Sequence, residues 1–167
     1  MISTTVIVCG QQTENPLPDL PVEVFQVIDL PLNVHEAVLT AKGLDYVVRL
    51  RVSNESASEL RGIRYVLKPI DPNRGVLNGM NPTEAFVLPA HESQTITLKG
   101  GRLRAWANRR FRFVLMVEQV ISADSIWEVI KAKDALETYL KGDYTVQPKV
   151  IRVANAVDAP PQTRVIY

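Results

Sequence analysis

The stretch that decides the fold is Leu44-Asp45-Tyr46-Val47-Val48-Arg49-Leu50-Arg51-Val52. Apolar side chains alternate here with mostly polar ones, and this period of two is typical of a β-strand with one face in a core and the other in water. The turn-forming cluster Ser53-Asn54-Glu55-Ser56 follows directly, and side chains of these types satisfy neighbouring backbone groups. The stretch therefore predicts an amphipathic strand that ends in a turn.

The same criterion predicts further strands on both sides of this one. They lie at about 22–28, 60–69, 85–88, 93–98, 111–121, 126–130 and 150–153. The segment 111–121 is apolar on both faces and is the predicted central strand, with Phe111, Phe113, Leu115, Val117 and Ile121 assigned to one face. Gly100-Gly101 is expected to end the strand at 93–98. Six to eight short strands separated by turn signals predict a mainly β fold, an antiparallel two-sheet sandwich.

One segment has the period of a helix instead. Apolar residues recur at helical spacing between 132 and 140, and Gly142 stands where a helix end commonly needs a positive φ. The sequence therefore predicts one short C-terminal helix near 132–141, packed on the sandwich.

The chain has 167 residues, which is the length of one domain. Residues 1–21 contain three prolines in their second half and are predicted to be an extended N-terminal segment. The sandwich with its helix is expected over 22–155, and an extended tail over 156–167. Within that tail, 163–167 is β-prone and follows two prolines, so it is expected to add to a sheet edge of its own domain or to form a homodimer with a second copy.

Composition excludes several classes of protein. Nineteen basic and eighteen acidic side chains give a net charge of +1, so the strong positive field of a dedicated nucleic-acid binder is not expected. The single cysteine, Cys9, allows no intrachain disulfide, and no window reaches the ~18–20 apolar residues of a transmembrane segment. Residues 1–10 lack the positive start of a signal peptide, which places the protein in the cytoplasm by default. A different start, or a removed leader, would place it outside the cytoplasm.

Three stretches of the sequence carry a resemblance to a known family. They are 46–56, with its Asn-containing turn, 63–67, with an inward tyrosine, and Leu88-Pro89-Ala90-His91-Glu92-Ser93-Gln94-Thr95-Ile96, in which a Pro-x-x-x-Ser turn opens a strand. Together they resemble the immunoglobulin-like or fibronectin-type-III-like domains of uncharacterised bacterial proteins. The resemblance covers about 22–130 and implies an adhesive, spacer or accessory role. The paired cysteines of antibody domains, and the tryptophan packed on them, are absent, which rules out a close antibody-type relative.

The candidate site is a cluster of basic residues without an acidic one among them. Six lie within fourteen positions: Lys99, Arg102, Arg104, Arg109, Arg110 and Arg112. Arginine forks bind phosphate, sulfate or carboxylate, and an interleaved aromatic ring can stack on a base or sugar. The expected anion or partner site is therefore Arg102, Arg104, Trp106, Arg109 and Arg110. In the alternative interpretation, the arginines pair with Glu118, Glu128 or other acids across the sheet and act as gatekeepers against aggregation.

Other chemistry-bearing residues give no site. His35 and His91 lie in predicted loops without further zinc ligands, and Trp127 is expected to pack within the fold. No nucleophile motif or phosphate-binding glycine loop is present, so no catalytic, cofactor or metal residue is predicted. Asn54-Glu55-Ser56 matches a glycosylation acceptor and is equally a plain turn.

These observations lead to three functional hypotheses in order. The first is a non-catalytic binding or structural module without cofactors, whose partner could be a protein or a glycan. The second is an anion-binding module for a polyanion, nucleic acid or acidic glycan, built on the arginine cluster. The third is a hydrolase, which would need two carboxylates facing each other in a pocket.

Overall fold

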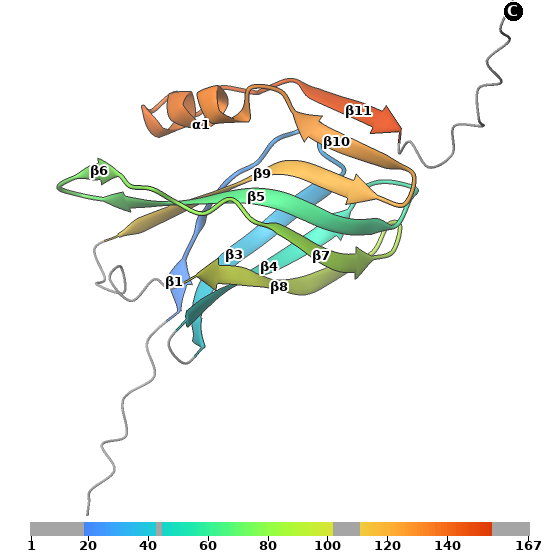
Figure 1. The fold of residues 1–167 in the computed structure, drawn as a ribbon, viewed down its shortest axis with the longest axis horizontal. Helices are drawn as coiled ribbons and strands as arrows, with labels where there is room; N and C mark the ends of the chain where they lie inside the picture. The colour runs from blue at the N-terminus through green and yellow to red at the C-terminus, as the bar shows by residue number, and fades with distance from the viewer. Residues whose placement is uncertain (1–18, 43–44, 102–110, 155–167) are drawn as a thin grey trace, which may run out of the picture.

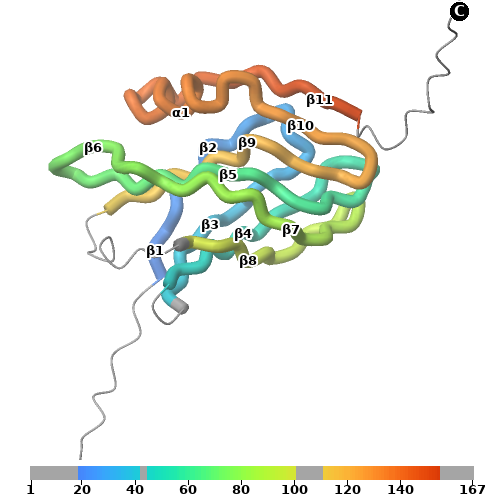
Figure 2. The backbone as a smooth tube through the Cα atoms, viewed as in Figure 1, coloured from blue at the N-terminus to red at the C-terminus, as the bar shows by residue number. Residues whose placement is uncertain are grey.

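The structure is a computed structural model that describes residues 19–42, 45–101 and 111–154. The prediction of a mainly β chain with two antiparallel sheets and one short helix is confirmed (Figure 1). The two sheets face each other across a buried apolar core, and the helix lies on the outer side of the second sheet (Figures 1 and 2).

Sheet A contains four strands in the order β1-β3-β4-β8. These are β1 (Leu20–Pro21), β3 (Leu32–Lys42), β4 (Asp45–Asn54) and β8 (Ser93–Gly101). All neighbours are antiparallel. Strand β4 is the stretch with the clearest alternation in the sequence, and its side chains at 46, 48, 50 and 52 are at most 3% exposed, as that pattern predicts.

Sheet B contains seven strands, of which β11-β10-β9-β5-β6 form the main path. Two short strands complete it, since β2 pairs with the first half of β9 in parallel and β7 pairs with the first half of β5. The bounds are β2 (Glu23–Phe25), β5 (Leu60–Asp71), β6 (Gly75–Val76), β7 (Thr83–Leu88), β9 (Arg112–Ser122), β10 (Ser125–Val129) and β11 (Val150–Ala154). Strand β9 has neighbours on both sides, which confirms the predicted central strand.

The helix α1 (Ala132–Leu140) adds a third layer over sheet B. Leu136 is 4% exposed, and the ring of Tyr139 stacks on Phe25 of β2 with centroids 4.4 Å apart. The helix ends at Leu140, and Gly142, two residues further on, has the predicted positive φ, at 103°. The amides of Gly142 and Asp143 donate to the carbonyls of Tyr139 and Thr138, a Schellman-type ending that satisfies the last turn.

Strand β3 was not among the strands predicted from the sequence. A β-bulge between Val34 and Glu36 inserts one extra residue, so the inward positions change from even to odd numbers within the strand. Because the alternation shifts by one residue in the middle of the strand, the segment does not show the unbroken period of two by which the other strands were predicted. His35 consequently lies in this strand and not in a loop, where the sequence had placed it.

A second bulge corrects the predicted faces of β9. Val117 pairs with Tyr65 and Gln119 pairs with Arg64, so Glu118 is the extra residue. After it, Val120 lies opposite Ile63 and is fully buried, whereas Ile121 is on the other face. The assignment of Ile121 to the same face as residue 113 was therefore wrong.

The predicted end of β8 before Gly100-Gly101 was also wrong, because the strand runs through Gly101. A Cβ at position 100 would lie 2.5 Å from the backbone oxygen of Tyr46 in β4. The glycine is thus required by the close approach of two strands and does not mark a turn.

The chain passes from sheet A to sheet B near its start. Pro21 pairs in sheet A with Val38, and two residues later Glu23 pairs in sheet B with Val114. Beyond this crossing, the side-chain amide of Gln26 lies along the edge of β3, accepting from the amide of residue 34 at 3.1 Å and donating to the carbonyl of residue 32 at 3.3 Å. This amide takes the place of a neighbouring strand's peptide group.

The sandwich has two ends that we name by their residues. At the network end, β4 finishes at Asn54, and β9 turns into β10 between Ser122 and Ser125. At the arginine end, β8 finishes at Gly101 and β9 begins at Arg112. The segment 102–110, between these two positions, contains four arginines and no acidic residue.

Candidate functional site

The five residues of the predicted anion site, Arg102, Arg104, Trp106, Arg109 and Arg110, lie outside the described residues. The structure does describe the strands on either side of them. Strand β8 ends in sheet A at Gly101, which pairs with Tyr46, and strand β9 begins in sheet B at Arg112. The arginine-rich segment therefore connects the two sheets at one end of the sandwich.

The two outer members of the basic cluster are engaged in ion pairs. Lys99 Nζ lies 3.7 Å from Glu84 Oε1, and Arg112 donates to a carboxylate oxygen of Glu23 at 2.5 Å. These acids differ from the two named in the sequence analysis, because Glu118 and Glu128 both pair with Arg64, at 3.4 and 3.3 Å. At Lys99 and Arg112, the structure thus shows the pairing of the alternative interpretation, with other partners.

An apolar hollow of about 380 Å³ opens beside the start of β9. It is lined by Leu20, Pro21, Val22, Glu23, Phe111, Arg112 and Phe113. Residues 20–23, where the chain crosses from β1 to β2, form one wall of the hollow. Residues 111–113, at the start of β9, form the other wall. The hollow therefore lies where the arginine-rich segment ends, and it combines an aromatic wall with one ion pair.

Glu23 is held in its charged form at this hollow. Burial by itself would raise its pKa, but hydrogen bonds from Arg112 and from the hydroxyl of Tyr139, at 2.8 Å, outweigh it and lower the pKa. Burial and the same hydrogen bond raise the pKa of Tyr139 to about 12. The wall of the hollow therefore contains one compensated ion pair, Glu23 with Arg112, and adds no net charge to that of the segment.

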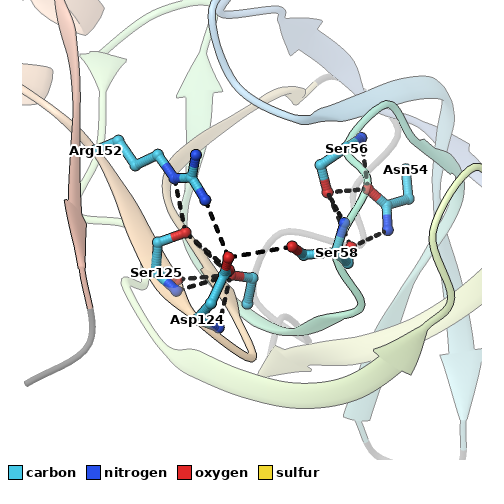
Figure 3. A network of polar contacts seen from close by, with 7 residues as sticks. Asn54, Ser56, Ser58, Asp124, Ser125 and Arg152 are labelled. Carbon is cyan, nitrogen blue, oxygen red and sulfur yellow. Dashed lines mark hydrogen bonds and ion pairs between the residues drawn. The ribbon is translucent and has the colours of Figure 1, made fainter. Parts of the chain in front are cut away.

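A second ordered polar cluster occupies the network end (Figure 3). Asn54 is 1% exposed, and its Nδ2 donates to the carbonyls of Ser58, Leu88 and Pro89 at 2.8, 3.2 and 3.0 Å. Its Oδ1 accepts from the amide and the hydroxyl of Ser56 at 2.9 and 2.7 Å. Because the amide nitrogen is buried and fully used, the Asn-Glu-Ser sequence here is a structural turn and not an accessible glycosylation acceptor.

The other half of this cluster is built around Asp124 in the turn between β9 and β10. Asp124 Oδ1 accepts from the hydroxyls of Ser122 and Ser125 at 2.6 and 3.0 Å, and these hydrogen bonds lower its pKa. Arg152 of β11 reaches Asp124 Oδ2 at 3.1 Å and lies 4.8 Å from the ring centroid of Trp127. The hydroxyl of Ser58 joins the two halves at 3.3 Å. The cluster connects three loops and leaves its polar atoms directed at one another.

One group of side chains contains the residue types of a catalytic triad in a different order. His35 Nε2 lies 2.9 Å from the hydroxyl of Ser53, which donates to Glu55 Oε1 at 2.6 Å. In a triad the histidine lies between serine and acid, so that it can take the hydroxyl proton. Here the serine is in the middle and its hydroxyl donates a hydrogen bond to the carboxylate, so the group links the end of β4 to the following turn.

Within the described part of the chain, no three histidine, cysteine, aspartate or glutamate side chains converge on a point where a metal ion could bind. In that same part, no helix is long and apolar enough to cross a membrane. The tail segment 163–167, proposed for dimer formation, lies outside the described residues. Among the strands that the structure describes, β11 pairs with β10 alone.

The hollow was not predicted from the sequence, because β1 and β2 were not recognised there as two separate strands. The signal available was Pro21 between two short apolar runs, since proline at the boundary of a strand favours an edge position. Comparison of the chain with protein-family models, with curated proteins and with solved structures finds no match.

Proposed function

We propose that the chain is an immunoglobulin-like binding module without catalytic activity that holds an acidic partner at its arginine end. The observation that carries the proposal is the position of the segment 102–110. Its four arginines lie in the connection between the two sheets, while the basic residues at either side of it are already compensated by Glu84 and Glu23. The four remaining basic residues of the cluster all belong to this one connection, at one end of the sandwich.

The strand order supports the immunoglobulin-like part of the proposal. Strands β3-β4-β8 face strands β7-β5-β9-β10, with β3 and β4 joined as a hairpin. Fibronectin-type-III-like domains arrange their strands A-B-E and C′-C-F-G in this order, and the loops at the ends of such sandwiches commonly carry binding residues. Fold alone does not establish a function, so the site must carry the argument.

The chemistry of the arginine end suits a carboxylate- or sulfate-bearing polymer. Arginine forks bind such groups with two parallel hydrogen bonds, and clustered charges raise the association rate at low salt. The neighbouring hollow offers aromatic surface to the less polar parts of the same ligand. Because the net charge of the whole chain is only +1, attraction is expected from this end and not from the surface as a whole.

The test is salt-dependent retention on immobilised heparin. We expect the double variant Arg109→Ala/Arg110→Ala to elute at clearly lower salt than the wild type. The matched control is Arg51→Ala/Arg61→Ala, which removes two exposed arginines toward the network end and is expected to elute at lower salt by much less. Equal elution of the wild type and the first variant, or equal shifts in the two variants, would overturn the proposal.

A further inference from the structure

A groove of about 360 Å³ runs between the helix α1 and the hairpin formed by β5 and β6. Its lining combines aliphatic side chains with more basic than acidic ones. The aliphatic residues are Val76, Leu77, Leu136 and Leu140, and the polar residues are Lys68, Asn78, Lys133, Glu137 and Lys141. Val76 is 48% exposed, so part of this apolar surface is open to solvent.

The positive charge at this groove is only partly compensated. Lys133 reaches Glu137, four residues further along the helix, at 3.9 Å. Within the described residues, Lys68 and Lys141 make no ion pair. An apolar channel with two uncompensated cations is complementary to a ligand that has an aliphatic part and a negative head group.

The length of the groove sets the size of the ligand. The helix residues on its wall extend from Lys133 to Lys141, which is ~12 Å at a rise of ~1.5 Å per residue. Leu136 and Leu140 line the groove on this stretch of the helix. An unbranched aliphatic chain that lies along the helix therefore contacts both leucines, and its charged end reaches a lysine.

We propose that this groove binds a free medium-chain fatty carboxylate. The aliphatic chain lies along α1 over these leucines, and the carboxylate is drawn to Lys68 and Lys141. An extended chain of about ten carbons covers the length, because each C–C bond of ~1.5 Å advances the chain by slightly less than its own length. The site is separate from the arginine end and does not depend on the function proposed there.

The test is titration calorimetry with decanoate below its micellar concentration. We expect saturable binding with one site, and weaker binding of hexanoate because it buries fewer methylene groups. The double variant Lys68→Met/Lys141→Met keeps the aliphatic stems and removes both charges. It is expected to weaken binding by ~4-fold to 25-fold, since each exposed charge contributes about twofold to fivefold. Val76→Asp places a negative charge at an exposed position and is expected to abolish binding.

The matched control is Lys149→Met, which removes an exposed lysine on the other flank of the helix. This variant is expected to bind decanoate as the wild type does, and circular dichroism confirms that each variant is folded. Equal affinity for decyltrimethylammonium, an equal loss in Lys149→Met or the absence of decanoate binding would overturn the proposal. Sedimentation with phosphatidylglycerol vesicles, in the absence of binding to free decanoate, would identify a membrane surface as the ligand and would likewise overturn it.

Discussion

Replacing Asn54 by alanine is expected to be among the most destabilising single changes at the network end. The side chain is buried and its two N–H groups serve three carbonyl oxygens, those of Ser58, Leu88 and Pro89. Its oxygen accepts two further hydrogen bonds from Ser56. The change would therefore separate the loop after β4 from the turn before β8.

The magnitude follows from these contacts. Two donated and two accepted hydrogen bonds at ~1 kcal/mol each give ~4 kcal/mol. Ser56 is only half-buried, so water replaces part of what its groups lose, whereas the carbonyl of the fully buried Leu88 stays without this donor. We expect a loss of ~3 kcal/mol in the free energy of unfolding, which lowers the Tm by about 6–12 °C in a chain of this size.

The assay is urea-induced unfolding followed by tryptophan fluorescence, with the m-value compared between variants. Asn54→Asp adds a second measurement, because it keeps the shape and replaces the donor by an oxygen that faces carbonyl oxygens. It is expected to destabilise at least as much as alanine at pH 7. The matched control, Asn73→Ala, changes an exposed asparagine and is expected to stay within ~0.5 kcal/mol. A loss below ~1 kcal/mol in Asn54→Ala, at an unchanged m-value, would refute the reasoning.

Three further changes test other parts of the structure. Hydrogen bonding holds the pKa of Glu23 in the folded protein below its ordinary value of 4.5. The contact of Glu23 with Arg112 therefore stabilises the fold above about pH 4.5, and this stabilisation is lost as the pH falls through the lower pKa of the folded state. In urea unfolding, Glu23→Gln should be less stable than the wild type at pH 7 and approach it at pH 3. A pH-independent difference would contradict this. Gly62→Ala would place a Cβ 2.7 Å from the backbone oxygen of Glu84 and is expected to cost ~1–3 kcal/mol, whereas unchanged stability would show that β7 can move. Gln26→Ala uncovers the edge of β3 and is expected to lower the free energy of unfolding by ~1–2 kcal/mol. It is also expected to cause concentration-dependent self-association in sedimentation velocity. A monomer of unchanged stability would count against that role of Gln26.

The sequence predicted those elements whose local pattern agrees with their place in the fold. In β4 the alternation continues without a break, and in α1 the helical spacing and Gly142 lead to the observed bounds. In β3 and β9 a bulge moves the pattern by one residue, and nothing in the local sequence marks where that happens. The glycine at position 100 was misread for a similar reason, because its requirement comes from Tyr46 in another strand.

The candidate site was predictable only in its composition. The basic cluster is visible in the sequence, but its ion pairs join residues far apart in the chain, such as Arg112 and Glu23. The groove beside α1 was not foreseen, because Lys68 and Lys141 come from separate elements that only the packing of the helix on sheet B brings together. Local patterns report burial and turns, and long-range pairing of charges requires the fold.

The positions of the first and last described strands, β1 and β11, at opposite ends of the sandwich have a mechanical consequence. The described fold begins at the arginine end with β1 and finishes at the network end with β11, so a pull between these points acts along the strands. Under such tension β1 slides against β3 and β11 slides against β10, and the ladder bonds of each pair share the load and must break together. A module joined in series with others would resist extension in this geometry far better than one whose terminal strands peel away bond by bond.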